Sequence, residues 1–362
     1  MRSQSVGLLD RLGLGPDGGL ANDHTVMPEQ EAEDLARSIW RIDGKATRLA
    51  TEKDDTFRLA ASDDNQYVVK ISNPSEALSS IDFEVELTRH VARSPYSVPV
   101  PDYIEAFDGA FIVGIRDQAG QNRFARIMTY TQGTTLDATS ASPGERERVG
   151  EILANLRFAT STFTHSADGR LCAWDVQHLP MLEPLLQEVD NPKHRKLLEA
   201  GFERFLRVAA GQLTGLRSQI LHNDFSKSNL IVDHNNPRFI NGVVDFGDAV
   251  HTGIAIDVST ALLNQLPRDA AERPVDDIFE GGRDVLRGYL RRADLTQAEL
   301  LLVPHLVMGR VIGRALITLH RAKLVASNTR YILRNTEQGW AQLSWFLSRT
   351  ADEVSAAFTS TE

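Results

Sequence analysis

The sequence of 362 residues contains one cysteine, Cys172. A single thiol cannot close an internal disulfide or build a cysteine-rich zinc site, so both kinds of covalent or metal staple are excluded within the chain. We expect Cys172 to be a small buried hydrophobic residue, in a protein that folds in a reducing compartment.

Positive charge is scarce as well. The chain has 39 Lys and Arg against 49 Asp and Glu, a formal net charge of -10, and no Lys/Arg-rich run. A nucleic-acid-binding protein needs a basic patch to meet the phosphate backbone, so nucleic acid is not an expected partner. A small cationic substrate fits this balance better.

Long apolar runs are also missing. Residues 1–24 lack a charged head followed by an apolar core, and no stretch of about eighteen apolar residues occurs. We therefore expect a cytoplasmic protein with no membrane span. Hydrophobic residues make up 42% and charged residues 24% of the chain, which is ordinary for a globular protein, and the length suits two lobes.

The first third of the chain is rich in predicted strands. Residues 1–28 contain several Gly and small polar residues and are expected to form a flexible lead-in, ahead of an amphipathic helix over 28–40. The polar "DDNQ" between "FRLA" and "YVVKI" predicts a hairpin, and apolar spacing predicts a helix over 80–92. The N-terminal lobe is predicted to span 29–130.

The rest of the chain, 131–362, is predicted to be a mostly helical C-terminal lobe. Its exception is 229–247, where two β-type runs flank a "DHNNP" turn. The fold class is therefore α+β with two lobes. Helical periodicity covers 144–164, 179–213, 268–292, 296–324 and 330–358, and the fourth begins with a capping box, Thr296 and Glu299.

Two short motifs flank the hairpin over 229–247. "HNDFSKSN" at 222–229 has the form H-x-D-x-x-x-x-N of a kinase catalytic loop, in which Asp224 is the base and Asn229 a metal ligand. "DFGD" at 245–248 supplies a second carboxylate, Asp245, to hold Mg²⁺. We expect His222 to pack and bond the loop backbone.

Each motif alone could be an ordinary turn, since Asp and Asn are common turn residues. Their order, and the hairpin between them that folds Asn229 back toward Asp245, favour one phosphoryl-transfer site.

A nucleotide site of this kind also needs a strand lysine and a helix glutamate to hold it. Lys70 in "YVVKI" is the strand lysine, and Glu84 on the following helix is its expected partner, with Glu86 as the alternative. The backbone from Met128 to Tyr130 either meets an adenine or is an ordinary linker. The lobe has no G-x-G-x-x-G loop, which argues against a protein kinase.

Substrate contacts are less sharply indicated. An ammonium group needs carboxylates or aromatic faces, and four residues near the motifs offer them. The pair at 174–175 could equally be a helix cap with a core aromatic. The candidates are Trp174, Asp175, Asp248 and His251.

Over about 30–350 the chain resembles the aminoglycoside phosphotransferase and choline kinase superfamily, which has a protein-kinase-like fold. Within it the likeness is to hydroxylysine-kinase-like proteins and to phosphotransferase domains fused to aminotransferases. It rests mainly on "ILHNDFSKSNLIV" and "GVVDFGDAVHTGIAIDVSTAL". The resemblance implies ATP and Mg²⁺ as cofactors, the site roles given above, and a loop-supporting role for Asp257. Asn223 stands where Gly is frequent in such proteins, and Asp55-Thr56 where Gln-Asn is.

These observations predict a kinase that phosphorylates a hydroxyl of a small amine or amino acid, of hydroxylysine, ethanolamine or homoserine type. One alternative is an antibiotic-modifying phosphotransferase, which a markedly acidic, open cleft would favour. Another is an inactive kinase-like binding module, which the presence of Lys70, Asp224, Asn229 and Asp245 argues against.

Overall fold

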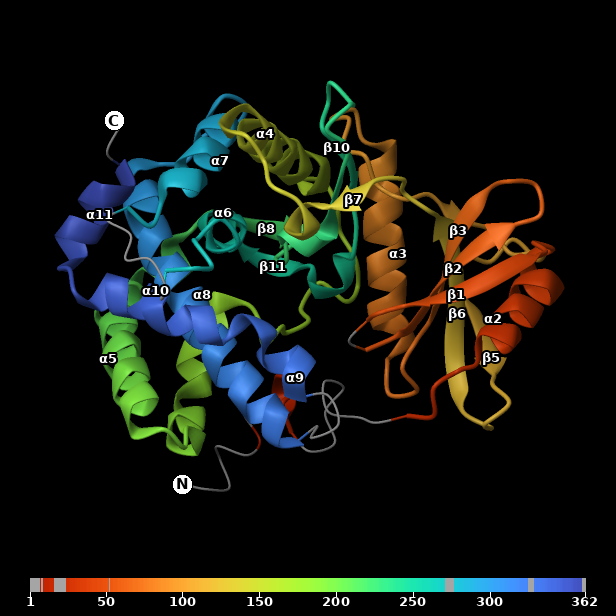
Figure 1. Cartoon of the computed structure of the whole chain (residues 1–362), viewed down its shortest axis with the longest axis horizontal. Coiled ribbons are helices and arrows are strands. Elements are labelled where there is room, and N and C mark those ends of the chain that lie inside the picture. The colour runs from red at the N-terminus through yellow and green to blue at the C-terminus, as the bar shows by residue number, and fades with distance from the viewer. Residues whose placement is uncertain are drawn as a thin grey trace.

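A β-rich N-terminal lobe and a mostly helical C-terminal lobe form the molecule (Figure 1). The structure is a computed structural model that describes residues 7, 9–15, 24–51, 53–270, 277–324 and 329–359. The two-lobed α+β architecture expected from the sequence is confirmed.

An antiparallel sheet forms the N-terminal lobe, in the order β1-β2-β3-β6-β4, with β5 also paired to β6. In β3 the side chains alternate, so Val69 and Ile71 are fully buried while Lys70 lies on the other face. The predicted hairpin around "DDNQ" joins β2 to β3. The strands are β1 (Gly44–Leu49), β2 (Asp55–Ala61), β3 (Gln66–Ile71), β4 (Tyr103–Ile104), β5 (Val113–Arg116) and β6 (Asn122–Thr129).

Two helical segments flank this sheet. Pro28 is the N-cap of α2 (Glu29–Leu35), which continues as a π-helical turn over Ala36–Trp40. The helix predicted over 80–92 is α3 (Leu78–Arg93), which lies between the sheet and the C-terminal lobe (Figure 1). Apolar residues of α3 pack against Tyr103 and Met128, and this packing holds α3 against the sheet.

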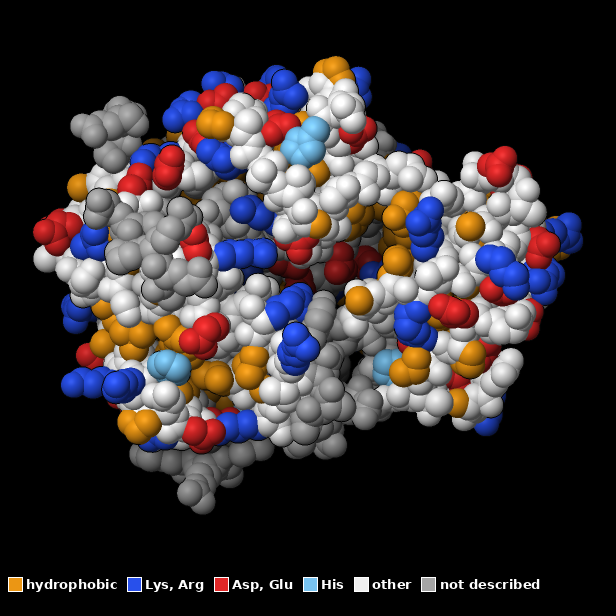
Figure 2. Space-filling model, viewed as in Figure 1, with side chains coloured by type: hydrophobic (Ala, Val, Ile, Leu, Met, Phe, Trp, Pro, Cys, Tyr) orange, Lys and Arg blue, Asp and Glu red, His pale blue; other side chains and the backbone are white. Residues whose placement is uncertain are grey.

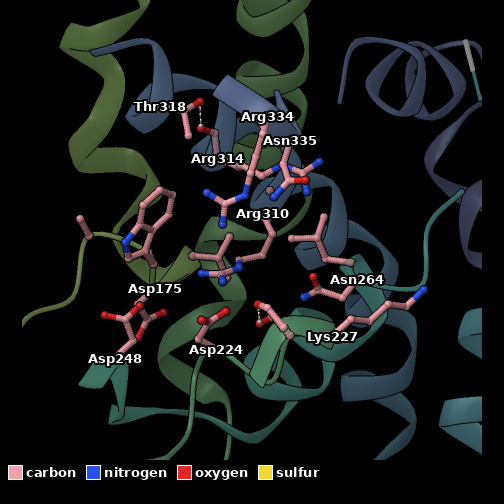
Figure 3. Close-up of a pocket in the computed structure, with 18 of the residues that line it drawn as sticks. Asp175, Asp224, Lys227, Asp248, Asn264, Arg310, Arg314, Thr318, Arg334 and Asn335 are labelled. Atoms are coloured by element: carbon pink, nitrogen blue, oxygen red, sulfur yellow. Dashed lines mark hydrogen bonds between the residues drawn. The ribbon is translucent and has the colours of Figure 1, made fainter. Parts of the chain in front are cut away.

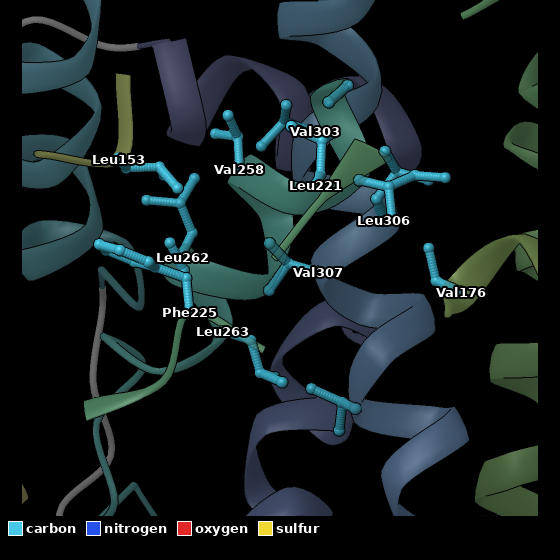
Figure 4. Close-up of a cluster of buried hydrophobic side chains, with 14 of the residues drawn as sticks. Leu153, Val176, Leu221, Phe225, Val258, Leu262, Leu263, Val303, Leu306 and Val307 are labelled. Atoms are coloured by element: carbon cyan, nitrogen blue, oxygen red, sulfur yellow. The ribbon is translucent and has the colours of Figure 1, made fainter. Parts of the chain in front are cut away.

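The C-terminal lobe is built around one long helix, α8 (Gln297–Leu324), which packs against several of the other helices. Figure 4 shows part of this core, in which residues of α8 meet others from α4, α6 and β8. The other helices are α4 (Pro143–Thr160), α5 (Pro192–Val208), α6 (Ile254–Leu263), α7 (Glu280–Leu290), α9 (Thr329–Ile332), α10 (Glu337–Leu347) and α11 (Ala351–Thr359).

The helix predicted over 179–213 is only partly correct. Residues Val176–Glu188 form 3-10 turns that contain Pro180 and Pro184, and the α-helix starts at Pro192. Proline has no N–H and clashes with the preceding turn, so an α-helix cannot run through this stretch.

By length and composition α8 could cross a membrane, since its most apolar 18-residue window has a mean hydropathy of 1.6. However, 78% of that window is buried inside the protein. The helix therefore serves as the core of the lobe, and the expectation that the protein has no membrane span stays a prediction.

Short strands carry the two motifs. The predicted hairpin over 229–247 is present as β9 (Leu230–Val232) and β10 (Ile240–Val243), and β9 also pairs with β7 (Thr134–Thr135). The sequence did not indicate a second pair, β8 (Ser218–Leu221) with β11 (Val250–Gly253). These two strand pairs bring residues 222–229 and 245–248 close together.

Part of the expected lead-in packs against the C-terminal lobe. Leu12 and Leu14 are buried in its core, and the Leu14 carbonyl lies 2.8 Å from His320 Nε2. Residues 24–28 of that segment are also described, whereas 1–6, 8 and 16–23 lie outside the described residues.

Candidate active site

The catalytic loop follows β8 and turns sharply at Asn223, which has a φ of 60°. Asn tolerates this left-handed conformation better than most residues. The Asn223 amide donates to Asp257 Oδ1 at 2.7 Å, from the first turn of α6. Asp257 thus anchors the turn that precedes Asp224.

Asp224 is held by the other end of the same loop. Asn229 Nδ2 donates to Asp224 Oδ2 at 2.7 Å and to its carbonyl at 3.0 Å. Burial raises the pKa of Asp224 to about 8, helped by the charges of Asp248 and Asp245 and opposed by Arg310. The carboxylate is therefore a stronger base than that of an exposed aspartate.

His222 is buried beneath this loop and bonds its backbone. Its Nδ1 accepts from the Asp224 amide at 3.3 Å, and its Nε2 lies 3.2 Å from the Val244 carbonyl. Burial lowers the pKa of His222 to about 4, although Asp245 opposes the shift. The imidazole is therefore neutral at physiological pH and ties the two motifs together.

Asp245 lies two residues after the end of β10 and also has a left-handed backbone, with a φ of 64°. This turn leaves its side chain 56% exposed, and Oδ1 lies 3.7 Å from Lys70 Nζ of the other lobe. Lys70 and Asp245 are 175 residues apart in the sequence, yet their side chains lie close together.

Lys70 is part of a buried cluster of charges. Its Nζ lies 3.0 Å from Glu84 Oε1, while Arg126 from β6 lies 2.8 Å from Glu84 Oε2. Burial opposes the charged form of Lys70, but Glu84 and Asp245 outweigh it and raise its pKa. Glu84, not Glu86, is the partner; Glu86 binds Arg89.

Asp54 lies just before β2 and close to the buried charges. Its carboxylate accepts from the Asn73 amide at 3.2 Å and lies 3.1 Å from Arg126. Lys53 forms an ion pair with Glu76, and burial lowers the pKa of Lys53. Asp55, one of the residues that depart from the family pattern, is buried and lies 2.8 Å from Arg123, so its role is structural.

The donor set of Asn229 and Asp245 fits a divalent cation that keeps further ligands of its own. The described residues contain no group of three or more His, Cys, Asp or Glu side chains able to hold a metal. Mg²⁺ commonly binds one or two protein oxygens together with water and phosphate oxygens. Because Asn229 Nδ2 faces Asp224, its Oδ1 is directed away from that carboxylate.

The segment proposed to meet an adenine lies at the end of β6. Met128 is buried against α3 and β4, and the Tyr130 amide donates to the Gln66 carbonyl at 3.0 Å. The Arg58 guanidinium lies 4.9 Å from the Tyr130 ring centroid. The Tyr130 N–H is therefore already used, and an adenine would need other backbone groups of this linker.

A cavity of about 360 Å³ opens beside Asp224. Figure 2 shows a hollow between the lobes with acidic side chains at its base and Lys or Arg side chains beside it. Three predicted substrate residues, Trp174, Asp175 and Asp248, line the cavity. His251 is exposed on β11 and is not one of the described residues that line it.

Asp175 also has the alternative role considered for it. It is the N-cap of the 3-10 segment, and its two oxygens accept from the amide and the side chain of Gln177, at 2.9 and 2.6 Å.

Sequence reasoning missed the arginines of the site. Arg126 is buried beside Glu84, while Arg310 and Arg314 line the cavity. A signal was present, because each interrupts an otherwise apolar run of a strand or helix, where a charge needs a partner.

Known kinases resemble this chain in sequence and in fold. The model of the phosphotransferase enzyme family matches residues 45–295. A hydroxylysine kinase from Danio rerio is 22% identical over 345 residues, covering 91% of this chain and 94% of that protein. These matches confirm the resemblance found in the sequence.

Two solved structures show the same fold. A microcompartment-associated aminopropanol kinase superposes with a TM-score of 0.67 and 19% identity, over 87% of this chain and 96% of that one. An amicoumacin kinase in complex with AMP-PNP, Ca²⁺ and Ami gives a TM-score of 0.64 and 18% identity, over 85% and 93%.

Proposed function

The chain belongs to the phosphotransferase enzyme family and is a small-molecule kinase, and on that premise we propose that it transfers the γ-phosphate of ATP to a hydroxyl of a small amine or amino acid. One arrangement carries the proposal. Asp224, fixed by Asn229 at 2.7 Å, lines a small cavity, and Lys70 reaches to 3.7 Å from Asp245 across the two lobes.

Each residue of the site has a separate role in the proposed reaction. Asp224 orients the acceptor hydroxyl and accepts its proton. Lys70, held by Glu84, contacts the nucleotide phosphates. Asn229 and Asp245 would hold Mg²⁺, which neutralises charge on the phosphates when bound.

The acceptor is proposed to be small. The hydroxylysine kinase and aminopropanol kinase that resemble this chain support an amino acid or an amino alcohol. The cavity of about 360 Å³ lies at the low end of the range of roughly 300–1,000 Å³ for small-molecule sites. Five Lys or Arg side chains line it, so it is not the markedly acidic cleft that a polycationic antibiotic would need.

The proposal is tested by ADP release with Mg²⁺ and ATP across hydroxylysine, amino alcohols, other hydroxyamino acids and aminoglycosides. Turnover of one small amine or amino acid should fall about 100- to 10,000-fold in Asp224→Asn, because the base is lost. The folded state should persist, as near-UV circular dichroism would show. Turnover of aminoglycosides alone, or full activity in the variant, would contradict the proposal.

A further inference from the structure

Two chemically different walls meet in the cavity beside Asp224. In Figure 3 Asp175, Asp224 and Asp248 lie on one side, while Arg310, Arg314 and Arg334 lie across the cavity from Asp175 and Asp248. A site for a simple amine needs only the acidic wall, since an ammonium group gains nothing from nearby cations. The basic wall therefore requires an explanation of its own.

The centre of the basic wall comes from two turns of α8. Arg310 and Arg314 are four residues apart and so share a face of the helix. Arg310 donates to the Asn223 carbonyl at 3.4 Å, and Arg314 to Gln342 Oε1 at 2.9 Å. In the described part of the chain, neither has a carboxylate oxygen within 4.0 Å.

Arg314 also lies close enough to other cations to be repelled by them. Burial, together with the charges of Arg310 and Arg268, lowers the pKa of Arg314 to about 10. Arg268 also lines the cavity, as does Lys227. An anion bound in this place would offset both the burial and the repulsion.

We propose that Arg310 and Arg314 bind a carboxylate of the substrate, so that the acceptor is a hydroxylated amino acid and not an amine without a carboxylate. The proposal rests on the proposed function, which places the acceptor hydroxyl at Asp224. A guanidinium offers a planar pair of N–H donors that matches a carboxylate. The ammonium group then lies toward Asp248, on the opposite wall.

The test measures binding without nucleotide, so that it does not depend on phosphoryl transfer. Calorimetric titration would compare 5-hydroxylysine with its primary carboxamide and with its decarboxylated diamino alcohol. Wild type should bind the carboxylate compound about 10- to 100-fold more tightly than either analogue, as expected for a charge-assisted pair. Arg314→Gln should remove most of this preference, and Arg314→Lys should keep part of it.

Lys323→Gln is the matched control. It removes one positive charge from the same helix, but Lys323 lies outside the cavity beside Asp190 at 3.0 Å, so the preference should not change. In turnover assays, Arg314→Gln should raise KM for the amino acid much more than it lowers kcat.

Equal binding of the three compounds by wild type, no binding of the carboxylate compound, or the same loss in Lys323→Gln would overturn the subsite. A carboxylate preference without turnover of any hydroxylated amine or amino acid would instead retain the subsite and contradict the proposed function.

Discussion

The two lobes differ in where the arginines nearest the site lie. In the N-terminal lobe, Arg123 and Arg126 are inside, with side chains 0% and 1% exposed, and each is paired with carboxylates. In the C-terminal lobe the interior is an apolar cluster of helices, and the arginines nearest the site gather at one cavity. The buried arginines of the N-terminal lobe are neutralised by carboxylates, whereas Arg310 and Arg314 have no carboxylate oxygen within 4.0 Å in the described part of the chain.

The largest effect on this contrast is expected from Arg123→Met. Arg123 lies 2.8 Å from Asp55, and its Nε donates to the Ser72 carbonyl at 2.6 Å. Removing Arg123 takes one of two paired arginines from buried Asp55, which keeps Arg48 at 2.5 Å, and leaves the Ser72 carbonyl without this donor. The N-terminal lobe should therefore be destabilised by about 3–5 kcal/mol. Hydrogen exchange resolved by peptide would show the loss in β2 and β6.

Arg37→Met is its control in the same lobe. Arg37 pairs with Asp34 and Asp43 at the surface, where water screens the charges, so its removal should leave exchange unchanged. Equal effects of the two variants would show that the buried pair has no special role.

A smaller effect is expected from Gly150→Ala, which breaks apolar packing in the C-terminal lobe. A Cβ at Gly150 would lie 1.9 Å from the Val285 carbonyl of α7, so α4 and α7 must separate. We expect a loss of about 1–3 kcal/mol in urea unfolding. In Gly144→Ala, on the same helix, the Cβ meets nothing within 4 Å, and stability should stay level or rise. Equal losses in both variants would contradict this packing argument.

The smallest effect concerns His305, a buried titratable group of α8. Burial lowers its pKa to about 4; the charge of Arg204 acts in the same direction and Asp352 opposes it. The unfolded chain takes up the proton at about pH 6.5 and the folded chain only near 4, so stability is lost as pH falls through that window.

The matching measurement is urea unfolding at pH 7 and pH 5. Wild type should lose about 1–2 kcal/mol more than His305→Gln over this interval. Identical pH dependence in the two proteins would show that folding does not lower the pKa of His305.

The sequence predicted the order of helices and strands well, but it did not predict the arginines of the site. Asp224, Asn229 and Asp245 are close to one another in the chain, and loop motifs of that length are visible as patterns. Lys70 and Glu84 could be paired because a strand followed by a helix offers few partners. Their roles, and those of Met128 and Tyr130, stay predictions.

Arg126, Arg310 and Arg314 could not be placed, because their partners lie far away in the sequence. Arg126 reaches Glu84 across 42 residues, and Arg310 reaches Asn223 across 87. The break at Pro180 and Pro184 was visible but was outweighed by apolar spacing. The expected cytoplasmic location also stays a prediction.

The basic wall comes from two elements that could change at different rates over evolutionary time. Arg310 and Arg314 project from the helix that forms the core, and Arg310 also bonds the catalytic turn, so replacing Arg310 would disturb the turn that precedes Asp224. Arg334, which is exposed, comes instead from a short 3-10 turn, Leu333–Asn335. Acceptor range should therefore diversify first through that turn, while the helix preserves the ancestral preference.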